Sequence, residues 1–337
     1  MFRCRPWGLA IPAIGLTLTT WTAFGLSPDE LGILYRRNDP ASEQVASRYQ
    51  VARHVPAENV VAIGIPDQPV IEPGQFEALR VSALARLPSR VRVLALVWTL
   101  PYAVGCMSIT TAFAAGYRAG FCEPGCGRTL LSPLYDASTL DSARRSGWMP
   151  AMLLPSADEP LAIDLIARGA RSDGTRPTAT VYLVSTEDAA RNVRAGSYLD
   201  AERNYGRTIS IRQLHTPITQ NISNVFTYFT GAARVMEIDQ LRFIPGAVAD
   251  HLTSMGGILN QTAQTTALHW IRAGATGSYG TVTEPCNHVG KFPSPMVFLA
   301  HYLNGETLIE AYWKAVAMPG QGLFVGEPLA APFAGRN

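Results

Sequence analysis

The chain has few charged residues and, beyond its first 24 residues, no long apolar run. Only 16% of its 337 residues are Asp, Glu, Lys or Arg, whereas 47% are hydrophobic. This balance excludes a disordered chain and predicts a large buried core. Because about 20 consecutive apolar residues are needed to cross a bilayer, we expect a mature protein that does not span the membrane.

Features of nucleic-acid and nucleotide binding are also missing. The 28 basic and 26 acidic residues are intermixed and leave a formal charge of +2, with no basic stripe. We therefore expect no nucleic-acid partner, and a secreted or surface protein or peptide is the better candidate. No G-x-G-x-x-G or Walker loop follows the first strand, so we assign no nucleotide or other cofactor.

Residues 1–25 resemble a secretory signal peptide. Two arginines precede an uncharged, mostly apolar run from Trp7 to Phe24, and Ala23 and Gly25 supply small residues at a cleavage site. This pattern predicts a secreted, periplasmic or cell-envelope protein. A retained N-terminal anchor is the alternative, because a run of about 18 residues is near the lower limit for a span.

Four cysteines follow this segment, namely Cys106, Cys122, Cys126 and Cys286. An even number in an oxidising compartment predicts disulfides. Four cysteines allow three pairings, and the sequence does not choose among them.

Alternating strand and helix patterns predict one α/β domain over residues 26–337, with a mostly parallel sheet between helices in a Rossmann-like or related three-layer fold. Strands are expected at 33–36, 60–64, 91–97, 178–184, 209–214, 224–230, 243–249 and 274–280. Helices are expected at 39–55, 74–87, 156–169, 186–193, 254–272, 296–303 and 307–316. Residues 99–150 are expected to be an irregular insertion that carries three cysteines, and the tail from Pro319 is also expected to be irregular.

Ligands of such sheets usually bind beyond the carboxyl ends of the strands. Asn38 and Asp39 follow the first strand, where Asp39 is best placed to cap the next helix. Chemically versatile side chains are concentrated later, with Asp250 and His251 after one strand and Glu284, Cys286 and His288 after the next. These residues form the predicted site.

Several long motifs resemble a family of exported bacterial proteins found in species with the exosortase system for sorting surface proteins. The motifs are Arg37-Asn-Asp-Pro-x-Ser42, His54-Val-Pro-Ala-Glu-Asn59, Arg191-Asn-Val-Arg194, Gly246-Ala-Val-Ala-Asp-His-Leu-Thr-Ser254, Gly274-Ala-Thr-Gly-Ser-Tyr-Gly-Thr-Val-x-Glu-Pro-Cys-Asn287 and Glu310-Ala-Tyr-Trp-Lys314. The resemblance covers nearly the whole mature chain. It implies a role in the envelope and no particular activity.

A more distant resemblance is to caspase- and gingipain-type cysteine peptidases, which place a His after one strand and a Cys after the next. That plan implies Cys286 as nucleophile and His251 as base, with Asp250 and Glu284 as companion carboxylates. In a competing register, the glycine-rich strand from Gly274 matches a later strand of those enzymes, and the protein shares the fold without the dyad. The chain also has no His-Gly pair.

Three interpretations of the site therefore remain open. The first is a peptidase-like hydrolase linked to surface-protein sorting, which requires a free thiol at Cys286. The second is a non-catalytic binding or accessory protein of caspase-like fold, in which Cys286 and His251 are structural. The third is a metal site formed by Asp250, His251, Cys286 and His288, although Cys-x-His alone is a weak metal signal.

Overall fold

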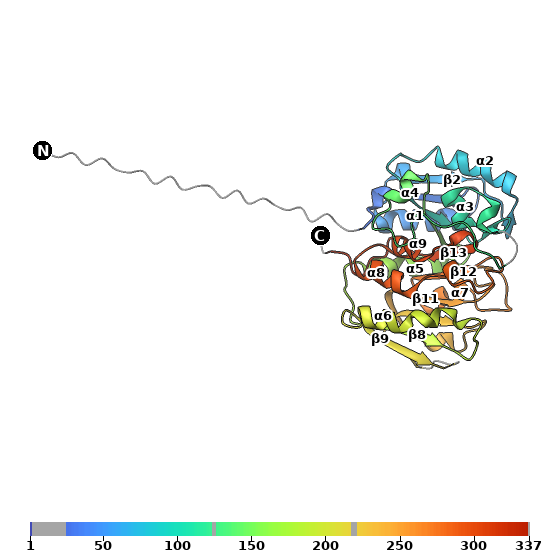
Figure 1. The fold of residues 1–337 in the computed structure, drawn as a ribbon. Coiled ribbons are helices and arrows are strands. Elements are labelled where there is room, and N and C mark those ends of the chain that lie inside the picture. Colours follow the sequence, from blue (N-terminus) through green and yellow to red (C-terminus); the bar gives the residue numbers. More distant parts are fainter. Residues whose placement is uncertain (2–24, 123–125, 217–220, 336–337) are drawn as a thin grey trace.

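The computed structural model describes residues 1, 25–122, 126–216 and 221–335, which form a mixed α/β fold. Within this part of the chain, a sheet of ten mostly parallel strands lies between layers of helices (Figure 1). This confirms the predicted three-layer α/β architecture. The apolar part of the predicted signal peptide lies outside the described residues. Among the helices that are described, none is both long and apolar enough to cross a membrane.

The elements follow one another along the chain as strand and helix units. The strands of the main sheet are β1 (Leu31–Arg36), β2 (Val60–Ile63), β4 (Val93–Val97), β7 (Ala151–Leu154), β8 (Thr180–Ser185), β9 (Ser210–His215), β10 (Val225–Gly231), β11 (Phe243–Leu252), β12 (Gly277–Thr281) and β13 (Gly322–Gly326). The α-helices are α1 (Pro40–Arg53), α2 (Pro73–Leu84), α3 (Ile109–Ala115), α4 (Asp141–Arg145), α5 (Glu159–Ser172), α6 (Tyr198–Tyr205), α7 (Ala267–Ala273), α8 (Pro295–Leu303) and α9 (Leu308–Ala315). A second, small sheet contains β3 (Val70–Ile71), β5 (Ala103–Val104) and β6 (Met107–Ser108).

The main sheet consists of two half-sheets that run in opposite directions. Its order is β2-β1-β4-β7-β13-β12-β11-β10-β8-β9. Neighbouring strands are parallel within the first five and within the last five, and only the central pair β12–β13 is antiparallel. The carboxyl ends of the two half-sheets therefore lie at opposite edges of the sheet.

Local sequence explains the regular start of the first half-sheet. The carboxylate of Asp39 accepts hydrogen bonds from the backbone N–H groups of Ala41 and Ser42, and Pro40 is the first residue of α1. Both features were predicted to begin this helix. Every residue of β4 is buried, as expected for an apolar run in a parallel strand covered on both faces.

Two central strands were not predicted. No strand was expected at β7. The tail from Pro319 was expected to be irregular, and this prediction is wrong over β13. The insertion from residue 99 also contains α3 and α4. The helix expected from residue 254 begins only at Ala267, and the one expected after residue 186 is a 3-10 segment, Asn192–Ser197, that leads into α6.

Buried contacts of Glu327, the residue after β13, attach the end of this strand to α1. Its carboxylate accepts hydrogen bonds from Tyr49 Oη at 2.5 Å and Arg53 Nε at 3.0 Å, both on α1. The second oxygen pairs with another nitrogen of the same guanidinium. Gly169 of α5 makes room, since a Cβ atom there would lie 2.4 Å from the carboxylate. Arg53 also pairs with the partly exposed Asp173, so loss of Glu327 would remove the buried one of its two counter-charges.

We expect Glu327→Ala to lower the free energy of unfolding by about 3–5 kcal/mol, because the Arg53 guanidinium would lose its buried counter-charge. Denaturant titration of the two proteins gives the difference. Asp200→Ala on α6 is the matched control, since its ion pair with Arg203 is exposed and should contribute less than about 1 kcal/mol. Equal effects of the two substitutions would show that Glu327 does not anchor β13.

Candidate functional site

The predicted site lies around β11 and β12, which are parallel neighbours. Asp250 and His251 are consecutive residues of β11, so their side chains point to opposite faces of the sheet. Cys286 follows β12 in a turn whose backbone passes through the left-handed region at both Cys286 and Asn287. The two predicted strands are therefore neighbours, as expected. The side chains of Asp250 and His251, however, point to opposite faces of the sheet and do not share one site.

His251 is a buried structural residue. Its Nδ1 accepts a hydrogen bond from Trp270 Nε1 at 2.9 Å, and its Nε2 lies 2.9 Å from the carbonyl oxygen of Thr265, to which it donates. Burial lowers the pKa of the imidazole to about 3, so the ring is neutral near pH 7. With both nitrogens engaged, His251 has no lone pair to offer a nucleophile or a metal ion.

Asp250 faces the other side of the sheet and pairs with the buried Arg194. One carboxylate oxygen lies 2.5 Å from a guanidinium nitrogen, and a second nitrogen of Arg194 donates to the carbonyl oxygen of Thr230 at 2.8 Å. The guanidinium also lies over the ring of Phe229 at 5.2 Å. Burial raises the pKa of Asp250 to about 6, and Arg194 opposes that rise. The pair fixes the segment before α6 against β10 and β11.

Cys286 forms a disulfide with Cys126, and Cys106 forms one with Cys122. A sulfur in a disulfide has no thiolate, so the assignment of Cys286 as a nucleophile is wrong for this state of the protein. Glu284 lies in the same turn, and its carboxylate accepts the backbone N–H of Cys286 at 2.8 Å, which stabilises the turn.

The metal interpretation fails for a related reason. Asp250 and His251 point away from each other, and Cys286 is bonded to another sulfur. No group of three or more His, Cys, Asp or Glu side chains in the described part of the chain is arranged to hold a metal ion.

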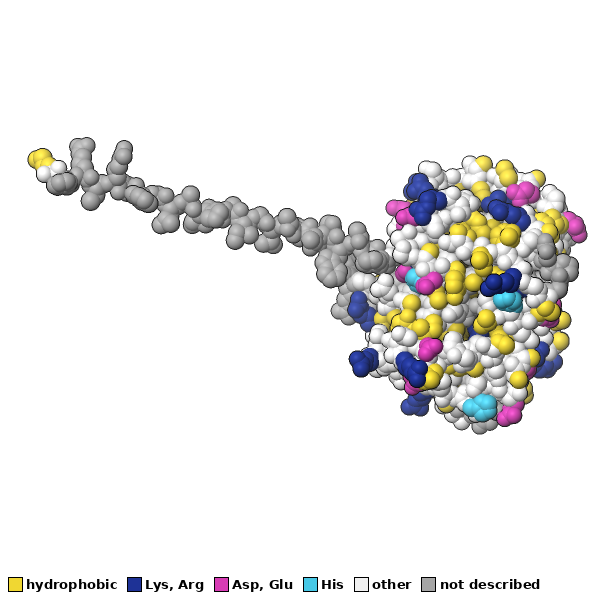
Figure 2. All heavy atoms as spheres, viewed as in Figure 1, with side chains coloured by type: hydrophobic (Ala, Val, Ile, Leu, Met, Phe, Trp, Pro, Cys, Tyr) yellow, Lys and Arg dark blue, Asp and Glu magenta, His cyan; other side chains and the backbone are white. Residues whose placement is uncertain are grey.

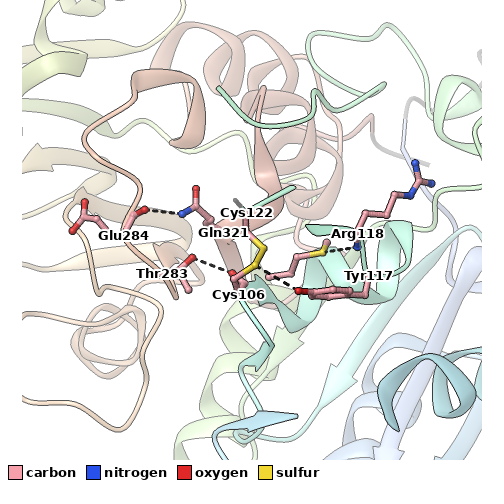
Figure 3. The surroundings of a disulfide bond; sticks show 8 residues. Cys106, Tyr117, Arg118, Cys122, Thr283, Glu284 and Gln321 are labelled. Atoms are coloured by element: carbon pink, nitrogen blue, oxygen red, sulfur yellow. Dashed lines mark hydrogen bonds between the residues drawn. A yellow bond between two sulfur atoms is a disulfide. The ribbon is translucent and has the colours of Figure 1, made fainter. Parts of the chain in front are cut away.

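The Cys126–Cys286 disulfide connects the insertion to the loop after β12, and the Cys106–Cys122 disulfide lies within the insertion. Figure 3 shows the Cys106–Cys122 disulfide beside the loop after β12. There, Thr283 Oγ1 donates to the carbonyl oxygen of Cys106 at 3.0 Å. Gln321 Nε2 donates to the carbonyl oxygen of Glu284 at 2.7 Å. The loop that carries Cys286 is therefore joined to the insertion by a disulfide and a hydrogen bond, and to the segment before β13 by a hydrogen bond.

A different part of the structure has the geometry of a ligand site. In the first half-sheet β1 lies between β2 and β4, so the chain leaves β1 in one direction and returns on its other side. The carboxyl ends of β1 and β4 flank this topological switch point, where ligands of open α/β sheets usually bind. A cavity of about 330 Å³ opens there. It is lined by Arg36, Asp39, Ala41, Asp67, Thr99, Leu100, Ser156, Ala157, Leu259 and Asn260.

The polar wall of this cavity is held by a network around Arg36, the last residue of β1. One guanidinium nitrogen lies 3.2 Å from Asp39 and 2.9 Å from Asp67. Another donates to the carbonyl oxygen of Leu100. Because its acceptors come from three separate segments, Arg36 has a fixed position before any ligand arrives.

A second cavity, of about 480 Å³, adjoins the first. Both are lined by Thr99 and Ala157. Thr99 Oγ1 accepts the backbone N–H groups of Ser156 at 3.2 Å and Ala157 at 3.0 Å, which joins the loops after β4 and β7. The second cavity extends toward the start of α5 and to Leu268 and Arg272 of α7. We refer to the two cavities together as the switch-point groove.

At the equivalent position in the second half-sheet, the described backbone is closely packed. There β8 lies between β9 and β10, which repeats the order of the first half-sheet. Thr186 Oγ1 donates to the carbonyl oxygen of Gly231 at 2.7 Å, across the ends of β8 and β10. A Cβ atom on Gly231 would lie 2.1 Å from the carbonyl oxygen of Arg191, so the backbone is closely packed at this point.

Sequence reasoning noted Asp39 at a strand end but interpreted it as a helix cap, and it missed the other residues of the groove. Arg36 and Thr99 stand at the ends of two predicted strands and could have been found by the rule that already identified Asp39. Ser156 and Ala157 were not recognised because β7, which they follow, was not predicted.

Comparison with protein-family models and with curated proteins finds no match. The assignment of the groove therefore depends on its geometry and chemistry.

We expect no free thiol in residues 26–337 of protein made in an oxidising compartment. Maleimide labelling of the denatured, unreduced protein, followed by peptide mass spectrometry, should leave Cys106, Cys122, Cys126 and Cys286 unlabelled, and labelling after reduction should modify all four. A maleimide adduct on Cys286 before reduction would contradict the pairing and revive the hydrolase interpretation.

Proposed function

We propose that the protein is an exported, non-catalytic binding or accessory protein of the bacterial envelope, and that it holds a segment of a secreted or surface protein in the switch-point groove. The observation that carries the proposal is the open groove at the carboxyl ends of β1 and β4, where ligands of open α/β sheets usually bind. The two cavities, of about 330 and 480 Å³, each fall within the range of small-ligand sites.

Export is supported by the two disulfides, because such bonds form and persist in oxidising compartments. The signal-peptide pattern and the resemblance to an exosortase-associated family point in the same direction. On the viewed face, basic and acidic side chains are scattered and no region of one sign dominates (Figure 2). Recognition by a local groove fits this surface better than recognition by a broad electrostatic field.

A binding role also agrees with the chemistry of the groove. Its hydroxyls belong to Thr99 and Ser156, and no histidine or cysteine lines either cavity. A hydroxyl needs an adjacent base to become a nucleophile. Thr99 Oγ1 instead accepts two backbone N–H groups, so its contacts brace the groove.

The proposal predicts that filling the groove abolishes binding of peptides. Ala157 is exposed and lines both cavities, so an indole in Ala157→Trp would occupy the junction between them. Fluorescein-labelled hexapeptides selected from a random library on the wild-type protein should bind Ala157→Trp about tenfold more weakly or worse. Fluorescence polarisation measures the affinities, and mass spectrometry should recover the peptides intact.

Thr208→Trp provides the control, because Thr208 is an exposed residue between α6 and β9 in the other half-sheet. It should bind the selected peptides as the wild type does. The proposal is refuted if Ala157→Trp binds them with unchanged affinity, or if the wild type cleaves them.

A further inference from the structure

We infer that the occupant of the switch-point groove is an extended peptide segment with a basic side chain. This inference rests on the proposed function, and it adds the chemical class of the ligand. It follows from three properties of the groove: its charge, its apolar walls and its length.

The first cavity has an excess of negative charge. Arg36 is the one cation in its wall, and it faces two carboxylates, Asp39 and Asp67. Asp39 is committed to the cap of α1. Asp67 is 69% exposed, so its carboxylate remains open to a ligand on the side away from Arg36.

The second cavity also has more carboxylates than cations in its wall. Its wall contains Asp158 and Glu159 and a single cation, Arg272. Asp158 caps α5 by accepting the backbone N–H of Leu161 at 3.2 Å. Glu159 is partly exposed and accepts a hydrogen bond from the side chain of Gln44. Each cavity thus has one more carboxylate than guanidinium, which favours a cationic group over an anionic one in both.

Apolar side chains lie beside these carboxylates. Leu100 and Leu259 line the first cavity, and Leu161 and Leu268 line the second. Leu259 and Leu268 are each only 7% exposed, so they form packed walls and not mobile surface groups. A lysine or arginine side chain has a matching structure, because its aliphatic stem packs on apolar surface while its charged end reaches a carboxylate.

The length of the groove distinguishes a peptide from a small free cation. The two cavities meet at Thr99 and Ala157, so one ligand that fills both must pass over this junction. An extended chain does so at a spacing of about 3.3 Å per residue. A single amine would occupy one cavity only.

The test uses acetylated, amidated hexapeptides in which one lysine is moved through the six positions, together with the same series containing norleucine. Norleucine keeps the aliphatic stem and removes the charge. At least one lysine peptide should bind about fivefold or more tightly than its norleucine partner, and added salt should reduce the difference.

Asp67→Asn or Glu159→Gln should remove most of this difference in affinity between lysine and norleucine peptides, whereas Asp200→Asn, at a distant exposed site, should not. Acetyl-lysine amide should bind at least about tenfold more weakly than that hexapeptide.

The outcomes separate the inference from the proposed function. If norleucine peptides bind as tightly as lysine peptides, and Ala157→Trp weakens both, the groove binds peptides but the inference about charge is wrong. If acetyl-lysine amide matches the hexapeptide, a small cation is the ligand and the inference of a peptide fails. If Ala157→Trp affects no peptide in either series, the proposed function fails as well.

Discussion

The antiparallel pair β12–β13 determines the arrangement of the molecule. The last strand of the chain inserts between β7 and β12 and joins two parallel half-sheets of opposite direction. The pair requires close packing, since a Cβ atom on Gly322 would lie 1.7 Å from the hydroxyl of Tyr279. The buried contacts of Glu327 with Tyr49 and Arg53 then attach this strand to α1. Because the halves are opposed, the strand ends that carry Arg36 and Thr99 lie at the edge opposite to Cys286.

The opposite directions of the two half-sheets separate the loop with Cys286 from the groove at Arg36 and Thr99. A single parallel sheet would have placed both at the same edge. The loop with Cys286 is joined to neighbouring segments by the Cys126–Cys286 disulfide and by hydrogen bonds between side chains and backbone. The edge with Arg36 and Thr99 retains an open groove. Within the second half-sheet, the backbone of Arg191 packs closely against Gly231 at the equivalent position.

Local sequence signals predicted most strands of the main sheet and missed two near its centre, β7 and β13. The start of α1 could be predicted because Asp39 and Pro40 act within one turn of the chain. By contrast, β7 is a run of only four buried residues, and β13 is bounded by glycines and follows a segment that reads as irregular. Their partners are distant in sequence, as in the pairing of Val325 with Leu153. Such pairings depend on the tertiary structure, which local periodicity does not report.

The same limit applied to the site. The sequence showed that His251 and Cys286 follow the expected order, but the environment of each was decided by tertiary contacts with Trp270, Thr265 and Cys126. The most direct test of the account is a crystal structure of the protein with its tightest-binding hexapeptide. We expect the peptide to lie across Thr99 and Ala157 while the Cys126–Cys286 disulfide stays intact. A peptide bound beside a reduced Cys286, with the groove empty, would contradict the account.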